Sequence, residues 1–180
     1  MGRAVTVMTD PGDADVTAWP GPGPLYHAAM PDSTTPPLRE AGRVILLDPG
    51  DRVLLFRYDD PPPNGRHWST PGGGLVAGED FAAGARRELA EETGWSDVPL
   101  GPQVFEQTIV MGYGARIVRQ HEVFFAARVP VACRALGDVA AMHVSDGIAA
   151  SRWWTADEID ATNEDIWPAG LADLVRSLNS

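Results

Sequence analysis

Residues 73–95 read GGLVAGEDFAAGARRELAEETGW and concentrate acidic side chains within a short stretch. Glu88, Glu91 and Glu92 stand at helical offsets of three and four residues, so on an α-helix they would share an arc of roughly 100°. Like charges at this spacing cost a helix about 0.2–0.5 kcal/mol per pair. The pattern therefore predicts a compensating cation, either the neighbouring arginines or a hard divalent metal with oxygen ligands.

An apolar stripe adjoins the acidic arc of this helix. Phe81, Ala85 and Leu89 repeat every four residues, which predicts that this side packs on a core. The carboxylates would then lie at the border between core and cleft, where a low dielectric strengthens their attraction to a cation. Gly94 is expected to end the helix. Ahead of it, residues 71–74 (PGGG) predict a loop whose backbone can approach phosphate or metal closely, because glycine has no Cβ.

The segment resembles the Nudix box, G-x5-E-x7-R-E-U-x-E-E-x-G-U, in which U is an aliphatic residue. The specified residues are present in register as Gly73, Glu79, Arg87, Glu88, Leu89, Glu91, Glu92 and Gly94. Trp95 departs from the pattern, since an aliphatic residue is usual at its position. The match is far more restrictive than a lone GxGxxG motif. A solvated helix with internal Arg–Glu pairs would explain the acids but not the glycines.

The resemblance implies an α/β (α+β) fold, an α/β/α sandwich in which helices flank a mixed β-sheet. It also implies Mg²⁺-dependent hydrolysis of a phosphoanhydride in a nucleoside diphosphate linked to another group, with Mn²⁺ able to substitute. The metal ligands that it implies are the Gly72 carbonyl and the carboxylates of Glu88, Glu91 and Glu92. Arg87 would orient these carboxylates, and Glu79 would hold the loop or bind a metal through water.

The general base is open at this level, because Nudix proteins draw it from the box or from a later loop or strand. Glu122 is the candidate outside the box, and the alternative interpretation is an outward-facing strand residue. His121 is a second candidate at neutral pH, although a lone strand histidine is more often a hydrogen-bonded surface residue.

Substrate choice depends on residues outside the box. Candidate substrate-binding residues are the arginines Arg57, Arg66, Arg116 and Arg119 for phosphates and the aromatic residues Tyr58, Trp68 and Tyr113 for a base. Tyr113 is placed similarly to a residue of Nudix enzymes that cleave dinucleoside polyphosphates. We therefore expect a dinucleoside polyphosphate or an oxidised or noncanonical nucleoside triphosphate. The alternatives are an ADP-ribose or other sugar-nucleotide pyrophosphatase, and a module that senses a nucleotide without turning it over.

Composition narrows the classes of protein. The 180 residues fit one domain with a sizeable core. A formal net charge of −11 argues against nucleic acid as the main partner, because a polyanion needs a basic surface. The single cysteine, Cys133, excludes an intrachain disulfide, and with no secretory segment this favours a cytoplasmic location. No apolar run approaches 18 residues, so no membrane span is expected. A homodimer remains open.

The remaining sequence predicts a tail followed by one domain. Residues 1–40 are rich in Pro and Gly and predict an N-terminal tail or linker, and residues 41–180 predict the domain. Strands are expected at 43–47, 52–56, 103–110, 116–129 and 151–154, the first two joined by a turn at 48–51. Residues 155–158 predict a capping box that opens a short helix, and a terminal helix is expected from Pro168.

Overall fold

The computed structural model describes residues 35–130, 143–144 and 146–179. The predicted tail up to residue 34 and Cys133 lie outside these described residues. In chain order the elements are β1 (Leu38–Leu47), β2 (Val53–Asp59), β3 (Arg66–Ser69), β4 (Gly72–Gly74), α1 (Phe81–Thr93), β5 (Leu100–Tyr113), β6 (Arg116–Arg128), β7 (Ile148–Trp154), α3 (Ala156–Ala161), β8 (Ile166–Trp167) and α4 (Leu171–Leu178).

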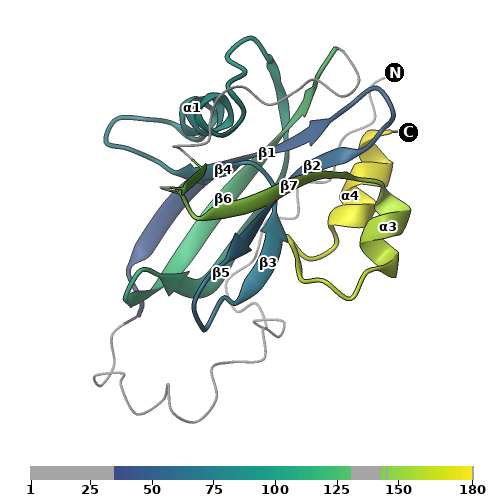
Figure 1. Ribbon diagram of the computed structural model, residues 1–180. Helices are drawn as coiled ribbons and strands as arrows, with labels where there is room; N and C mark the ends of the chain where they lie inside the picture. Colours follow the sequence, from purple (N-terminus) through teal and green to yellow (C-terminus); the bar gives the residue numbers. More distant parts are fainter. Residues whose placement is uncertain (1–34, 131–142, 145, 180) are drawn as a thin grey trace.

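The described strands form one mixed sheet. Its main order is β5-β6-β1-β2-β3-β8, with β4 paired to β1 and β7 paired to β2. β1 runs parallel to β6 and antiparallel to β2 and β4. Helix α1 lies on one side of the sheet, and α3 and α4 lie on the other (Figure 1). The predicted sandwich of helices around a mixed sheet is confirmed.

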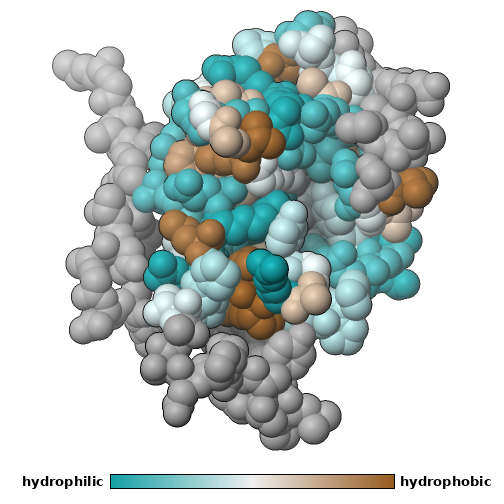
Figure 2. Space-filling model, turned by 90° about the vertical axis from the view of Figure 1, so that its left-hand side faces the viewer, coloured by the Kyte–Doolittle hydropathy of each residue, from teal (hydrophilic) through white to brown (hydrophobic). Residues whose placement is uncertain are grey.

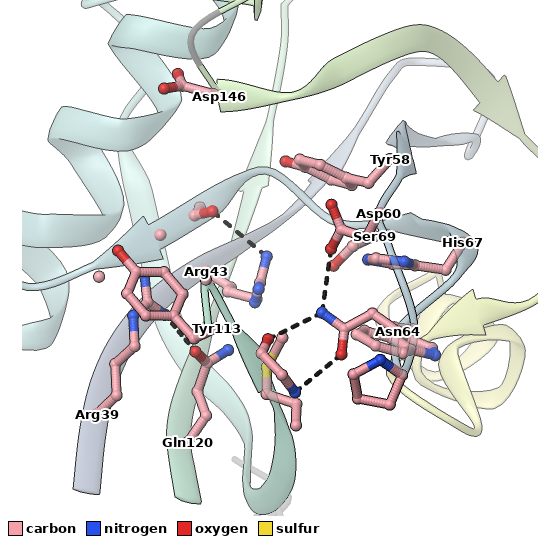
Figure 3. A pocket seen from close by; sticks show the side chains of 18 of the residues that line it. Arg39, Arg43, Tyr58, Asp60, Asn64, His67, Ser69, Tyr113, Gln120 and Asp146 are labelled. Atoms are coloured by element: carbon pink, nitrogen blue, oxygen red, sulfur yellow. Dashed lines mark hydrogen bonds between the residues drawn. The ribbon is translucent and has the colours of Figure 1, made fainter. Parts of the chain in front are cut away.

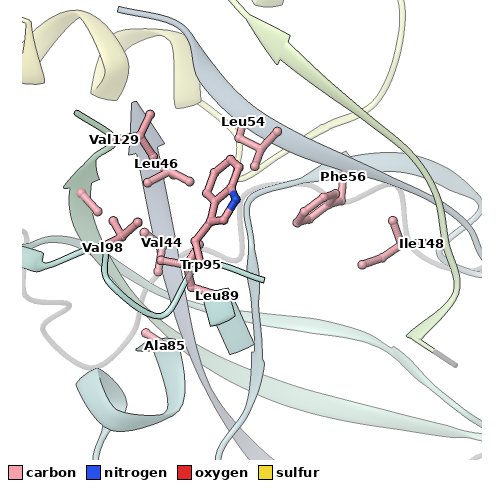
Figure 4. Close-up of a cluster of buried hydrophobic side chains, with 11 residues drawn as sticks. Val44, Leu46, Leu54, Phe56, Ala85, Leu89, Trp95, Val98, Val129 and Ile148 are labelled. Atoms are coloured by element: carbon pink, nitrogen blue, oxygen red, sulfur yellow. The ribbon is translucent and has the colours of Figure 1, made fainter. Parts of the chain in front are cut away.

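Alternate residues of β1 pack into two hydrophobic cores, one on each face of the sheet. Val44 and Leu46 belong to a buried cluster with residues of α1, whereas Ile45 and Leu47 belong to a second cluster with residues of α4. Trp95, the residue that departs from the box, lies in the first cluster and is only 3% exposed (Figure 4). Its large side chain therefore occupies core volume rather than the cleft.

The side chain of one aspartate stabilises the predicted turn between β1 and β2. Asp48 is fully buried, and its Oδ1 accepts hydrogen bonds from the backbone N–H groups of Gly50 (2.9 Å) and Arg52 (3.0 Å). β1 itself begins at Leu38, three residues before the domain boundary that we set at residue 41. These first residues pair with β6, 81 positions away along the chain, and their polar sequence carries no local strand signal.

The short elements around the sheet differ most from the sequence expectations. β3, β4 and β8 were not expected as strands, because two to four residues give no periodic signal. The capping box of α3 is confirmed, with Thr155 and Glu158 exchanging hydrogen bonds. The terminal helix begins at Leu171 rather than Pro168, because Gly170 before it has a left-handed φ of 75°. Among the described helices, none is long and apolar enough for a membrane span.

Candidate active site

Helix α1 carries the box acids and packs unusually close to the sheet. Its N-cap, Asp80, accepts a hydrogen bond of 2.7 Å from the backbone N–H of Ala83, and Gly94 ends the helix at φ 74°. A Cβ on Gly42 of β1 would lie 2.3 Å from the carbonyl oxygen of Phe81, so only glycine permits this approach. The acidic side of the helix is thereby brought against the glycine strand β4.

Arg87 joins the acids of the box to one another. Its Nε and Nη2 donate to the two carboxylate oxygens of Glu79 at 2.8 and 3.0 Å, and Nη1 donates to Glu88 at 2.8 Å and Glu91 at 3.0 Å. Nη2 also donates to the carbonyl oxygen of Gly74 at 2.8 Å. These hydrogen bonds hold the pKa of Glu79 at about 2. Arg87 therefore lies where the resemblance places an orienting residue.

Glu92 is the most enclosed acid of the box. Its side chain is buried, Oε2 accepts a hydrogen bond from the Gly72 N–H at 2.8 Å, and Oε1 accepts one from the Tyr58 hydroxyl at 3.1 Å. Burial raises the pKa of Glu92 to about 8, although the Gly72 and Tyr58 hydrogen bonds and the Arg43 charge act in the opposite direction. A carboxylate in this position gains from a nearby positive charge.

Glu88 lies against the glycine strand from the helix side. A Cβ on Gly73 would come within 2.6 Å of the Glu88 carboxylate, so the missing side chain leaves the space that the acid occupies. Burial raises the pKa of Glu88, and the charges of Glu91 and Asp146 act in the same direction, while Arg87 opposes them. Glu88 and Glu92 both line the same cavity.

The donor set fits a hard cation without forming a closed cage. Among the described residues, no three His, Cys, Asp or Glu side chains converge as a metal site. Nη1 of Arg87 donates to both Glu88 and Glu91, and the Glu91 side chain is 38% exposed and does not line the cavity. Mg²⁺ ordinarily keeps several waters and binds through one or two carboxylates plus substrate phosphates. Glu88, Glu92 and the Gly72 carbonyl therefore fit such an ion.

The cavity beside these acids has a volume of about 500 Å³. It is lined by residues of β1 to β4, of the loop between β2 and β3, of α1, of the end of β5 and the turn after it, of β6 and of β8, with Asp146 at one side (Figure 3). The side of the molecule that carries α1 is mainly hydrophilic, with apolar side chains in small separate groups (Figure 2). Such a surface suits a charged ligand better than an apolar partner.

An aromatic ladder forms the wall of the cavity opposite α1. The rings of Tyr58 and His67 are stacked at 5.4 Å, and the rings of His67 and Trp167 are stacked at 3.9 Å. Burial lowers the pKa of His67, so its ring is neutral at pH 7. Asn64 closes the rim nearby, because its amide exchanges two hydrogen bonds of 2.9 Å with the backbone of Gly112.

Beneath the cavity, Arg43 and Glu122 form a buried ion pair. Arg43 also donates to the carbonyl oxygens of Thr70 (3.0 Å) and Gly72 (3.4 Å). Burial opposes the ionisation of Glu122, but Arg43 and the amide of Gln107 at 2.7 Å hold its pKa below the usual value. Glu122 is 3% exposed and does not line the cavity, so its carboxylate is enclosed rather than directed at a ligand.

A family model of the NUDIX domain matches residues 37–176. The chain belongs to the Nudix family. It is 48% identical over 58 residues to an RNA pyrophosphohydrolase of Caulobacter vibrioides, a match that covers 32% of this chain and 33% of that protein. The chain therefore spans about a third of that relative. It is 35% identical over 114 residues to a protein of Mycobacterium tuberculosis with the provisional name 8-oxo-dGTP diphosphatase 2, covering 60% and 79% of the two chains.

A solved structure supports the same fold. The MutT protein of Methanosarcina mazei superimposes with a TM-score of 0.59 at 19% identity, covering 82% of this chain and 96% of that chain. Nudix proteins generally use divalent metal ions, and the oxygen-rich site beside α1 agrees with this property.

The structure separates the predicted substrate residues into two groups. Tyr58 and Tyr113 line the cavity beside the box acids. The other candidates, Arg57, Trp68, Arg116 and Arg119, do not. Strand alternation explains Trp68: its neighbours His67 and Ser69 face the cavity, while Trp68 lies in the second core and donates to Glu164 at 2.9 Å. Arg66 lies on the surface, where it pairs with Asp59. His121 packs edge-on against Phe81 with ring centres 5.1 Å apart, on the α1 side.

Several cavity residues carried no usable signal in the sequence. Arg43 is the residue at which we expected the first strand to begin, and Arg39 lies in the part of β1 ahead of it. His67 lies in a strand too short to recognise. Asp146 is followed by Gly147 ahead of β7, and this Asp-Gly turn signal in the sequence could have drawn attention to it. Its charge contributes to the raised pKa values of Glu88 and Tyr58, so it faces the same space.

Proposed function

We propose that this Nudix protein is an Mg²⁺-dependent hydrolase of a phosphoanhydride bond in a nucleoside polyphosphate. The observation that carries the proposal is the joint lining of one cavity by Glu88, Glu92 and the bare backbone of β4. Acids next to unobstructed backbone suit a pyrophosphate held through a divalent ion. The same cavity has aromatic rings on which a nucleobase could stack, so it has groups suited to both the phosphates and the base of a nucleotide.

Each group of this chain would contribute one task. Glu88 and Glu92 would supply carboxylate ligands, and Arg87 would orient Glu88 and Glu91 through its hydrogen bonds to both. Tyr58 would hold the Glu92 carboxylate in a single orientation through its 3.1 Å hydrogen bond. Bound Mg²⁺ would neutralise the charge of the phosphates, which otherwise repels an attacking water.

The proton of the attacking water needs an acceptor at the cavity surface. Glu122, our candidate from the sequence, is enclosed by Arg43, Gln107 and Gln120, and its position favours a role in holding Arg43 and the loop carbonyls. Asp146 is exposed and lines the cavity. We therefore propose Asp146 as the base, so that Asp146→Asn would lower kcat, while Glu122→Gln would chiefly lower stability.

Two parts of the cavity indicate the substrate class: the aromatic ladder, and the side beside β4 that would bind phosphate. The names of the two relatives refer to pyrophosphohydrolysis of RNA and to 8-oxo-dGTP, and both support a phosphoanhydride next to a nucleoside. The net charge of −11 favours a small nucleotide over a long polyanion. We therefore keep a nucleoside triphosphate or dinucleoside polyphosphate as the main proposal. A purely sensing role is disfavoured because every acid of the box is retained.

The test is a substrate panel with purified full-length protein. It would compare canonical and oxidised nucleoside triphosphates, dinucleoside polyphosphates, ADP-ribose, other nucleotide sugars and 5′-triphosphorylated RNA, each with Mg²⁺, Mn²⁺ or a chelator. Hydrolysis in ¹⁸O water would locate the attacked phosphorus. We expect metal-dependent cleavage of at least one triphosphate or dinucleoside polyphosphate. Absence of cleavage across the panel, together with tight binding of one nucleotide, would support the sensing role instead.

A further inference from the structure

Arg39 is a cavity residue whose surroundings point to an anionic ligand. It extends from the start of β1 and lines the cavity beside β4. Its Nη1 donates a hydrogen bond to Oε1 of Gln120, and its guanidinium carbon lies 4.2 Å from the centre of the Tyr113 ring (Figure 3). A guanidinium has five N–H donors, so this neutral amide and ring leave most of its capacity for a ligand.

The partners of Arg39 differ from those of Arg43, the other arginine in the cavity. Arg43 is paired with Glu122 and bonded to two backbone carbonyls, which commits it to the fold. Arg39, by contrast, makes no ion pair within the described part of the chain, although acids outnumber bases in this protein by 25 to 14. A cation held by neutral groups keeps its charge for an incoming phosphate.

The glycine strand β4 lies between this cation and the box acids. A Cβ on Gly74 would lie 2.6 Å from Nη2 of Arg39, and a Cβ on Gly73 would lie 2.6 Å from Oε1 of Glu88. Successive residues of a strand face opposite sides, so the guanidinium and the carboxylate approach β4 from its two sides at neighbouring glycines. Both groups line the same cavity.

We propose that Arg39 binds a phosphate group of the substrate that the divalent ion does not hold, and that Tyr113 and Gln120 position it for this task. The cavity would then bind substrates that carry a further phosphate beyond the metal-held pyrophosphate more tightly than substrates that carry a neutral sugar at that position. This inference rests on the proposed function, since it assigns the polyphosphate end of the same cavity. Arg39 is a specificity-determining residue in this scheme, and Tyr113 is a positioning residue.

The first test measures binding without turnover or a nucleobase. Titration calorimetry in Mg²⁺ would compare inorganic tripolyphosphate with pyrophosphate on the parent, Arg39→Gln and Arg86→Gln. Gln removes the charge, and Arg86 is an exposed arginine of α1 outside the cavity. We expect the parent to prefer tripolyphosphate, Arg39→Gln to lose about 10-fold or more of that affinity, and Arg86→Gln to match the parent. Equal affinity of Arg39→Gln and parent, or no binding of tripolyphosphate by the parent, would overturn the inference.

The second test separates this inference from the proposed function. On a triphosphate substrate that the parent cleaves, Arg39→Gln should raise KM about 10-fold with little change in kcat. Tyr113→Leu should raise KM about 2- to 5-fold, and Tyr113→Phe, which keeps the ring, should restore the parental value. Unchanged KM in Arg39→Gln would refute the role of Arg39 and leave the hydrolase intact, whereas a parent that cleaves no anhydride would refute the proposed function itself.

Discussion

The backbone N–H of Gly72 donates a hydrogen bond of 2.8 Å to Oε2 of Glu92, which joins the last acid of the Nudix box to the strand in front of it. The two residues are separated by a loop and three turns of helix, yet the bond fixes the buried carboxylate beside the carbonyl that we propose as a metal ligand. Because Glu92 is buried and its pKa is about 8, its charge is stabilised mainly when a cation is present. This relationship links catalysis, metal binding and stability.

Replacing Glu92 with Gln should abolish most of the activity and preserve the fold. Gln keeps the size of the side chain and an acceptor for the Gly72 N–H, but it removes the negative charge that a metal needs. We expect kcat to fall roughly 100-fold or more, with a melting temperature in the absence of metal no lower than that of the parent. Steady-state kinetics and thermal denaturation check both points. Parental activity in this variant would remove Glu92 from the metal site.

The stability of the metal-free protein should depend on pH through Glu92. Its folded pKa of about 8 exceeds the ordinary value of 4.5, so the fold favours the protonated acid. The stabilisation of the fold by protonated Glu92 is complete below pH 4.5 and is lost as the pH rises through about 8. We expect the free energy of unfolding of Glu92→Gln minus that of the parent to grow across this window, and Mg²⁺ to reduce the difference. A difference that stays constant from pH 5 to 9 would contradict the raised pKa.

Arg87→Lys should impair catalysis although the charge is retained. A lysine ammonium cannot donate at once to Glu79, Glu88 and the Gly74 carbonyl in the geometry of a planar guanidinium. We expect kcat to fall by about 10-fold or more and the apparent affinity for Mg²⁺ to weaken. Arg86→Lys, a neighbouring exposed position, is the matched control. Similar kinetics for both lysine variants would show that Arg87 acts only through its charge.

Gly73→Ala should displace Glu88 without unfolding the domain. The new Cβ would meet the Glu88 carboxylate at 2.6 Å, and a flexible side chain can move away at small cost. We expect weaker Mg²⁺ binding by calorimetry and lower kcat, with nearly parental thermal stability. In a double-mutant cycle with Glu88→Ala, the second substitution should add little, because the two act on one group. Additive losses would mean that Gly73 acts independently of Glu88.

Trp95 should contribute to stability and not to chemistry. It is 3% exposed within the core cluster beneath α1, so Trp95→Ala leaves a large cavity and should cost about 3–5 kcal/mol of unfolding free energy. Trp95→Leu, the aliphatic type usual in the box, should cost less. Val76→Ala, at a position 55% exposed, should change stability by less than about 0.5 kcal/mol. Urea denaturation measures all three, and a loss in Trp95→Ala no larger than that of Val76→Ala would contradict the packing role.

The box helix and the main strands were predictable because their signals are local. The spacing of Phe81, Ala85 and Leu89 reports the packed side of α1, and Gly94 reports its end. The aliphatic runs around Asp48 likewise predict a hairpin. The short strands β3 and β8 were missed, because they form only where other strands supply their hydrogen bonds.

The sequence by itself determined the family, the acid-bearing helix and the donor types available for a cation, since each depends on residues within one short frame. Tertiary structure alone decided that Arg39 and Arg43 join the cavity, that Glu122 is enclosed and that Trp68 turns into the core. The physical reason is that a cavity wall is built by strand pairing between distant segments. A shift of one residue in the pairing of a strand turns every side chain to the other face. No local sequence pattern shows which face lines the cavity.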